Sequence, residues 1–298
     1  MTQALQRPNS PWISLIILLA LMLGFTIALA IIGLLLPFES ALAEDANIFM
    51  RYTLLASGTI FTFLLPAIAL QLIERYYNYF PREKYAGGGV YLLAFLFLLA
   101  FSPVMQLVGE WNESLSLPAS LKGIEEWMRL QEDSMAELTE RMVMVDKVPL
   151  LLLNIVVMAI LPAVAEEFFF RGNLMHIIQR MARNHHISIW LTAIIFSAIH
   201  FQFYGFVPRM LLGAFFGYMF VWTQNIWVPV VAHFINNAFV TILAFSYARQ
   251  GKSFADLQAY ESYSIFVYIG ALVLSAMIGY VFYRYTNNKR KMYGTRVG

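Results

Sequence analysis

Long runs of apolar residues recur along almost the whole chain and are separated by short polar segments. Eight runs meet or approach the length of about 20 residues that a helix needs to cross a hydrocarbon core about 30 Å thick. Their expected bounds are 12–36, 52–73, 90–109, 149–178, 187–203, 208–224, 227–247 and 263–285. The pattern predicts an all-α fold, a polytopic membrane helical bundle with about eight transmembrane helices.

The composition supports this prediction and excludes other classes of protein. Hydrophobic residues make up 60% of the 298 positions, whereas charged residues make up only 13%. An average soluble domain carries about 25% charged residues, so soluble, disordered and fibrous classes are excluded. The chain has no cysteine, which excludes disulfides, thiolate metal ligands and a cysteine nucleophile. No motif typical of nucleic-acid binding is found, and we expect no nucleic-acid partner.

Charged residues are distributed unequally between the two sides of the predicted bundle. Eight spans place both termini on one side, which carries 11 basic residues and only two acids, one of them Glu74. The other side carries 8 basic residues and 14 acids, nine of which fall between Glu110 and Asp146. Because lysine and arginine are retained on the cytoplasmic face, we expect both termini in the cytoplasm and a bacterial-type plasma membrane around the bundle.

The acidic segment 110–147 is the one long polar stretch between the expected spans. Its part from Ile124 to Val143 has apolar residues at helix-compatible spacing. We interpret it as an extracytoplasmic amphipathic helix that covers one end of the bundle.

Three formal charges remain inside the expected spans, and they cluster in one of them. Glu166, Glu167 and Arg171 fall in the string AEEFFFRG. An ionisable group in the bilayer costs about 3 kcal/mol or more, so this cluster needs partners or a water-filled cavity. Glu167 and Arg171 are four residues apart and can form an ion pair that fixes helix packing. Glu166 is rotated by about 100° from Glu167, which leaves its carboxylate free to act as a general base.

Two other expected spans carry polar residues that could complete a site. His200 lies deep in the span 187–203, and His233 and Asn237 lie four residues apart on one face of the span 227–247. Each histidine alone would more often serve packing or an interhelical hydrogen bond. Together with Glu166, these residues can converge on one water molecule if their helices are neighbours.

At these residues the sequence resembles the CPBP family of intramembrane proteases. That family includes the type II CAAX prenyl endopeptidases and bacterial relatives linked to bacteriocin processing or self-immunity. Its three motifs occur here in order and cover about residues 150–245. They are EExxxR at Glu166, Glu167 and Arg171, FxxxH at Phe196 and His200, and HxxxN at His233 and Asn237.

The resemblance divides the chain and implies an activity. It implies a catalytic core at 149–247, preceded by a three-helix region at 1–148 and followed by a last helix and basic tail at 248–298. It implies that Glu166 and His200 activate a water for attack on a peptide carbonyl and that His233 and Asn237 stabilise the oxyanion. Glu167 and Arg171 would then support the helix. The expected substrate is a membrane-associated peptide or lipidated protein, either prenylated at a CAAX-type end or a leader peptide, and the other expected partner is membrane lipid.

The sequence leaves open whether the reaction uses a cofactor. Members of the family are widely labelled metalloproteases, and zinc would be held by Glu166, His200 and His233. No HExxH motif is present and these ligands would come from three separate helices, so we favour a reaction that uses no cofactor.

Two other functions compete with the protease. One is a non-catalytic membrane scaffold or self-immunity protein of the same fold. The other is a transporter in which Glu166 relays protons, although the paired broken helices typical of such proteins are not seen.

Overall fold

In the computed structural model, the described residues are 9–35, 47–83, 87–259 and 262–292, and nearly all of them are helical. Within these ranges the extended pairing is limited to an isolated bridge between Arg82 and Asn225. Some of the charged residues that were counted on the two sides of the membrane lie outside these ranges. They are Arg7, Glu39, Glu44, Asp45, Lys84, Glu261 and Arg296. The last residue of the first expected span, residue 36, also lies outside them.

Seven helical segments of the described part are long and apolar enough to cross a membrane. This confirms the all-α fold and identifies an integral membrane protein. The segments are Pro11–Leu34, Ile48–Ile73, Gly88–Glu113, Val148–Ala182, Phe203–Thr223, Trp227–Arg249 and Ile265–Lys289. The elements that form them are α1 (Pro11–Leu35), α2 (Ile48–Thr59), η2 (Ile60–Leu64), α3 (Leu65–Ile73), α4 (Gly88–Glu113), α6 (Val148–Asn154), η4 (Ile155–Ile160), α7 (Leu161–Glu167), η5 (Phe168–Leu174), α8 (Met175–Ala182), η6 (Phe203–Gly205), α10 (Phe206–Thr223), α11 (Trp227–Arg249) and α13 (Ile265–Met292).

The span expected at 187–203 differs from the structure. It corresponds to α9 (His185–Ala198), whose 14 residues reach only about 21 Å at 1.5 Å per residue. The chain turns directly after this helix, where Phe201 has a positive φ of 53° and Ser197 donates a hydrogen bond to the Phe206 carbonyl at 2.6 Å. His200 therefore lies in a turn between α9 and α10 and not deep inside a helix.

The helix that carries the glutamates runs from α6 to α8 and contains two wide turns of π type, η4 and η5. The first ends immediately before Leu161 and Pro162, and the second begins immediately after Glu167. Proline has no N–H to donate to the preceding turn, so the regular ladder is interrupted there. Wide turns of this kind often occur at functional sites.

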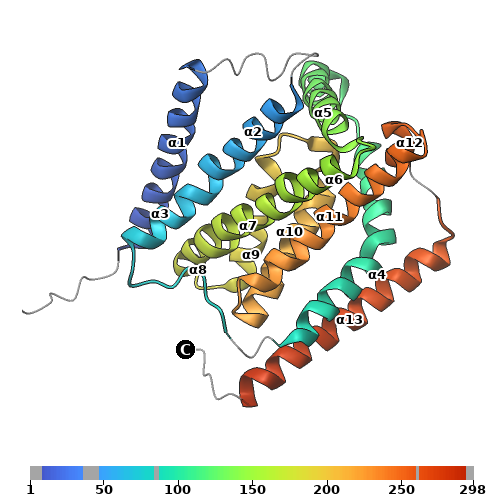
Figure 1. The fold of residues 1–298 in the computed structure, drawn as a ribbon. Helices are drawn as coiled ribbons and strands as arrows, with labels where there is room; N and C mark the ends of the chain where they lie inside the picture. Colours follow the sequence, from blue (N-terminus) through green and yellow to red (C-terminus); the bar gives the residue numbers. More distant parts are fainter. Residues whose placement is uncertain (1–8, 36–46, 84–86, 260–261, 293–298) are drawn as a thin grey trace, which may run out of the picture.

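The elements form one bundle with a central group and two flanks (Figure 1). α6 to α8, α9, α10 and α11 lie at the centre, with α1 and α3 on one side and the packed pair α4 and α13 on the other. Phe168, Phe169 and Phe170 fill the core between the central helices and α3.

One end of the bundle is covered by α5 (Lys122–Val143) and α12 (Phe254–Gln258) (Figure 1). α5 confirms the helix expected at 124–143, and it is preceded by the short η3 (Ala119–Leu121). The Trp127 ring lies 5.6 Å from the Phe203 ring, and Glu132 accepts a hydrogen bond from the Tyr204 backbone N–H at 3.2 Å. The acidic helix therefore contacts the turn that follows His200.

Candidate active site

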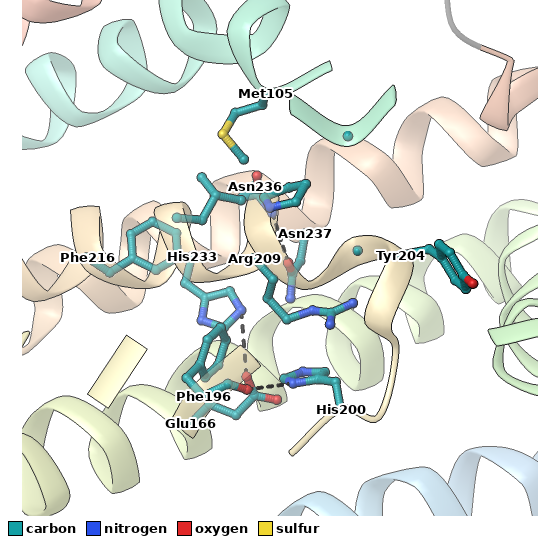
Figure 2. A pocket seen from close by; sticks show the side chains of 14 residues that line it. Met105, Glu166, Phe196, His200, Tyr204, Arg209, Phe216, His233, Asn236 and Asn237 are labelled. Carbon is teal, nitrogen blue, oxygen red and sulfur yellow. Dashed lines mark hydrogen bonds and ion pairs between the residues drawn. The ribbon is translucent and has the colours of Figure 1, made fainter. Parts of the chain in front are cut away.

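A cavity of about 420 Å³ lies between α4, α7, α10 and α11 and the turn after α9 (Figure 2). This volume falls within the range of about 300–1,000 Å³ that is typical of ligand pockets. Phe196, Leu212 and Phe216 belong to its apolar walls. Its charged and polar lining residues are Glu166, His200, Tyr204, Arg209, His233, Asn236 and Asn237.

The four residues expected to act on substrate all line this cavity. Glu166 comes from α7, His200 from the turn after α9, and His233 and Asn237 from α11. The three segments that carry these residues are therefore neighbours in the structure, which the spacing along the sequence could not establish. The role of each side chain remains a prediction.

Glu166 is a carboxylate with little direct support from its neighbours. It accepts no hydrogen bond within the described part of the chain, and its closest ion-pair distance is 4.0 Å, from Oε2 to His233 Nε2. Its side chain is 13% exposed, toward the cavity. A carboxylate held this way can accept a proton from a bound water molecule.

Glu167 has the opposite environment, because its side chain is fully buried and paired twice. Its Oε1 accepts hydrogen bonds from Arg171 Nη1 at 2.7 Å and from His233 Nδ1 at 2.9 Å. The ion pair with Arg171 is the one that the spacing predicts. The sequence did not predict the contact with His233. Because a carboxylate oxygen accepts hydrogen bonds, this contact places a proton on His233 Nδ1, and it turns Nε2 toward Glu166.

Arg171 ties this helix to α10. Its Nη2 donates to the Gly213 carbonyl at 2.9 Å, and its guanidinium lies 4.8 Å from the centre of the Phe196 ring. A Cβ atom on Gly213 would lie 3.2 Å from Phe196 and 3.4 Å from Arg171, so the absence of a side chain permits this close approach. These contacts support the expected structural role of Arg171.

His200 is oriented by the end of its own helix. Its Nδ1 donates to the Phe196 carbonyl at 2.8 Å, a group that the end of α9 leaves available. In this tautomer the Nε2 atom has no proton and can accept one or hold a water molecule. In Figure 2 the His200 ring and the Glu166 side chain lie at the same end of the cavity.

Two neighbouring amides form the wall opposite Glu166. Asn237 donates to the Met158 carbonyl at 3.4 Å, and Asn236 donates to Asn237 Oδ1 at 3.3 Å. Met158 lies in the wide turn η4, whose geometry frees carbonyl groups from the regular ladder. Sequence reasoning missed Asn236, although its position beside Asn237 in a membrane helix was a usable signal.

Arg209 is the second residue that sequence reasoning missed. It occupies the second position of the expected span 208–224 and was counted among the charges exposed to water. In the structure it lines the cavity together with Glu166 and His200 (Figure 2). The signal was available, because a cation at the edge of an apolar run either reaches water or faces a polar cavity.

The candidate zinc ligands do not form a metal site in this arrangement. Three converging histidine, aspartate or glutamate side chains are not found anywhere in the described ranges. The Nδ1 atoms of His200 and His233 form hydrogen bonds with the Phe196 carbonyl and with Glu167, which leaves the Nε2 atom of each ring available, and His233 Nε2 lies 4.0 Å from Glu166. A zinc ion would need ligand atoms about 2.0–2.2 Å from one common point, and a reaction without a cofactor stays a prediction.

Fold and site define a polytopic helical membrane protein with a carboxylate, two imidazoles and two amides around an internal cavity. Residues 148–239 match the family model described as "Type II CAAX prenyl endopeptidase Rce1-like". This segment is therefore similar to the type II CAAX prenyl endopeptidases, in agreement with the resemblance to the CPBP family that the three motifs indicate.

A curated relative is similar to part of the chain. The "Uncharacterized protein YpbD" of Bacillus subtilis (strain 168) is 32% identical over 116 residues, which make up 37% of this chain. The chain spans 57% of the length of that relative. No solved structure matches the chain.

Proposed function

We propose that the protein is an intramembrane endopeptidase that hydrolyses a peptide bond in a membrane-associated peptide or lipidated protein. The observation that carries this proposal is the carboxylate of Glu166, which accepts no hydrogen bond in the described part of the chain and faces an internal cavity beside His200 and His233. A buried charge without compensating hydrogen bonds is costly to keep, and such groups are typical of reaction sites.

The proposed reaction uses a water molecule bound between Glu166 and His200. Its oxygen attacks the carbonyl carbon while Glu166 accepts one of its protons. His233 and Asn237 donate hydrogen bonds to the carbonyl oxygen as negative charge develops on it. His233 donates from Nε2 when its ring carries both protons, a form for which Glu167 supplies the counter-charge. Glu166 then delivers its proton to the amine nitrogen as the C–N bond breaks.

The proposed setting is a bacterial-type plasma membrane with both termini in the cytoplasm, which rests on the excess of basic residues on that side. Substrates would enter from the lipid or from the membrane surface. Prenylated CAAX-type ends and unprenylated leader peptides both remain candidates.

The test is hydrolysis of a panel of prenylated and unprenylated peptides by purified protein in lipid nanodiscs, with products identified by mass spectrometry. Glu166→Gln keeps the shape of the side chain and removes the base. We expect it to lower kcat by about 10²- to 10⁴-fold. The matched control is Glu126→Gln, which changes an exposed carboxylate of α5 that pairs with Lys122 at 3.6 Å.

Equal turnover by wild type and Glu166→Gln would contradict the proposal. Binding of a peptide without any cleavage by the wild type would favour the non-catalytic scaffold.

A further inference from the structure

The turn that carries His200 joins the end of α9 to the start of α10 and has a conformation that needs support. Phe201 has a positive φ of 53°, which a bulky residue rarely adopts. Such a conformation persists only where the surrounding structure fixes it, and it is typical of functional sites. His200 lies directly before Phe201, so the contacts that fix this turn also fix the backbone of the histidine.

Asn112, near the end of α4, holds this turn at two points. Its Nδ2 donates to the Phe203 carbonyl at 3.0 Å, and its Oδ1 accepts a hydrogen bond from the Val207 N–H at 2.7 Å. The donor and the acceptor belong to one planar amide, which therefore sets the distance between two backbone groups four residues apart. The side chain is buried, with 3% exposure, so replacing it removes both restraints at a place that water enters only in part.

Two further side chains hold the same turn at one point each. Ser197 of α9 donates to the Phe206 carbonyl at 2.6 Å, and Glu132 of α5 accepts a hydrogen bond from the Tyr204 N–H at 3.2 Å. Ser197 belongs to the helix that the turn follows, and Glu132 to the helix that covers this end of the bundle. The amide of Asn112 joins the turn to α4, which forms a wall of the cavity.

The position of this turn matters for the site, because His200, Tyr204 and Arg209 all line the cavity (Figure 2). The hydrogen bond from His200 Nδ1 to the Phe196 carbonyl fixes the rotation of the ring. Where the ring lies relative to the opposite wall depends on the backbone of the turn. A shift of about 1 Å in a group that takes part in a reaction can lower its rate by about 100-fold.

We propose that Asn112 is a positioning residue that holds His200 in the place from which it acts beside Glu166. This inference rests on the proposed protease function and adds a residue to it. Asn112 lies outside the three motifs and outside the matched segment 148–239. It does not line the cavity, so it acts through the backbone of the turn.

The first test measures kcat and KM of Asn112→Leu in nanodiscs, with the peptide that the wild type cleaves best. Leucine is similar in size to asparagine and forms neither hydrogen bond. We expect kcat to fall by about 10- to 100-fold, as for groups that orient a catalytic histidine. KM should stay near its wild-type value, because the walls formed by α7, α10 and α11 are unchanged.

Asn154 provides the matched control, because it is a buried amide with the same number of hydrogen bonds. It accepts one from the Tyr52 hydroxyl at 2.7 Å and donates one to the Met142 carbonyl at 2.7 Å. Asn154→Leu should therefore lower the midpoint of thermal unfolding in detergent about as much as Asn112→Leu. It should keep the wild-type kcat, since it does not contact the turn.

Combination with His200→Ala shows whether Asn112 acts through the histidine. Residues that act through one another are not additive, so Asn112→Leu should lower kcat in the wild-type background and have no further effect in the His200→Ala background. A residue that only stabilises the fold lowers kcat by the same factor in both backgrounds, and this result would overturn the proposal.

Modification of His200 by diethyl pyrocarbonate gives a readout that needs no turnover. The reagent reacts with an unprotonated ring nitrogen, which is Nε2 in the observed tautomer. We expect Asn112→Leu to raise the rate at His200 by about 10-fold, because the loss of two hydrogen bonds makes the turn open more often. His186, exposed near the start of α9, is the internal reference and should keep its rate. Asn154→Leu should change neither rate, as measured by mass spectrometry.

The outcomes separate the two proposals. Wild-type kcat and wild-type reactivity of His200 in Asn112→Leu overturn the role of Asn112 and leave the protease intact. A wild type that cleaves no peptide overturns the protease, and the reactivity of His200 then decides whether Asn112 positions it. The same reactivity decides if His200→Ala has no measurable turnover. If Asn112→Leu does not fold, Asn112→Ser replaces it in each measurement, because serine is polar but too short to reach both backbone groups.

Discussion

Two carboxylates of this protein, the buried Glu74 and the partly buried Glu166, have opposite surroundings. Glu74 follows α3 and is fully buried, although its place between two expected spans suggested exposure to water. It accepts hydrogen bonds from Asn9 Nδ2 at 2.8 Å, from Ser14 Oγ at 2.7 Å and from the Tyr79 hydroxyl. Arg180 Nη1 lies 3.9 Å from its Oε2 atom.

Glu166 has little of this support, since it accepts no hydrogen bond in the described part of the chain, lies 4.0 Å from His233 Nε2 and faces a cavity. Burial alone therefore does not identify a reactive carboxylate. A group whose lone pairs are filled by its own protein acts as a structural anchor, whereas a group left open keeps its lone pairs for a ligand. The four predictions below test this contrast.

Removal of the satisfied carboxylate should have the largest effect on stability. Glu74→Ala leaves Asn9, Ser14, Tyr79 and Arg180 without their common partner, and we expect a loss of about 3–5 kcal/mol in the free energy of unfolding. Glu166→Gln should leave that free energy unchanged or raise it, because it removes a partly buried charge that accepts no hydrogen bond in the described part of the chain. Unfolding in detergent measures both, and equal losses would show that the two sites do not differ.

Glu167 combines a property of each carboxylate. It is buried like Glu74, and through His233 it is connected to the cavity that Glu166 faces. Glu167→Gln weakens the hydrogen bonds with Arg171 and with His233 Nδ1, and we expect kcat to fall by about 10- to 100-fold, as for groups that orient a catalytic histidine. The fall in kcat should be larger than the fall in the fraction of folded protein. A kcat that follows only the folded fraction would assign Glu167 to packing alone.

Tyr79 gives the Glu74 cluster a dependence on pH. Burial, together with the hydrogen bond and the negative charge of Glu74, raises the pKa of Tyr79 above its ordinary value of 10.0. The unfolded chain therefore loses this proton first, and stability should fall as the pH rises above about 10. We expect Tyr79→Phe to cost about 1 kcal/mol at pH 8 and to flatten the alkaline decline. Unfolding of both proteins between pH 8 and 11 measures this, and parallel curves would contradict it.

Removal of metal should have the smallest effect. No group of three potential metal ligands is found in the described part of the chain, and we expect kcat to stay the same within error after dialysis against a chelator. Elemental analysis of the active preparation is the control. Stoichiometric zinc, together with activity that chelation abolishes and zinc restores, would reinstate Glu166, His200 and His233 as ligands.

The sequence was sufficient to predict most helices and the ion pair between two residues of the same helix. Runs of about 20 apolar residues predict helices such as α4 and α11, and the four-residue spacing predicts the ion pair between Glu167 and Arg171. It did not predict where α9 ends. The residues from Phe201 to Phe206 are rich in aromatics and so extend the apolar run, although the backbone turns there.

Contacts between helices were beyond a single sequence. The hydrogen bond of Glu167 with His233, the burial of Glu74 and the position of Arg209 in the cavity all depend on which helices are neighbours. Spacing along the chain fixes which residues share a face of one helix. This spacing does not tell which other helix packs against that face.

The two wide turns beside α7 make the number of residues in this helix as important as their identity. A π turn holds about one residue more than an α turn, so each turn shifts the following side chains by about 100° around the axis. Deleting one residue between positions 155 and 160 would keep every motif letter and still rotate α7 relative to α6. Glu167 would then take the place on the cavity wall that Glu166 now occupies, and Glu166 would turn away from the cavity.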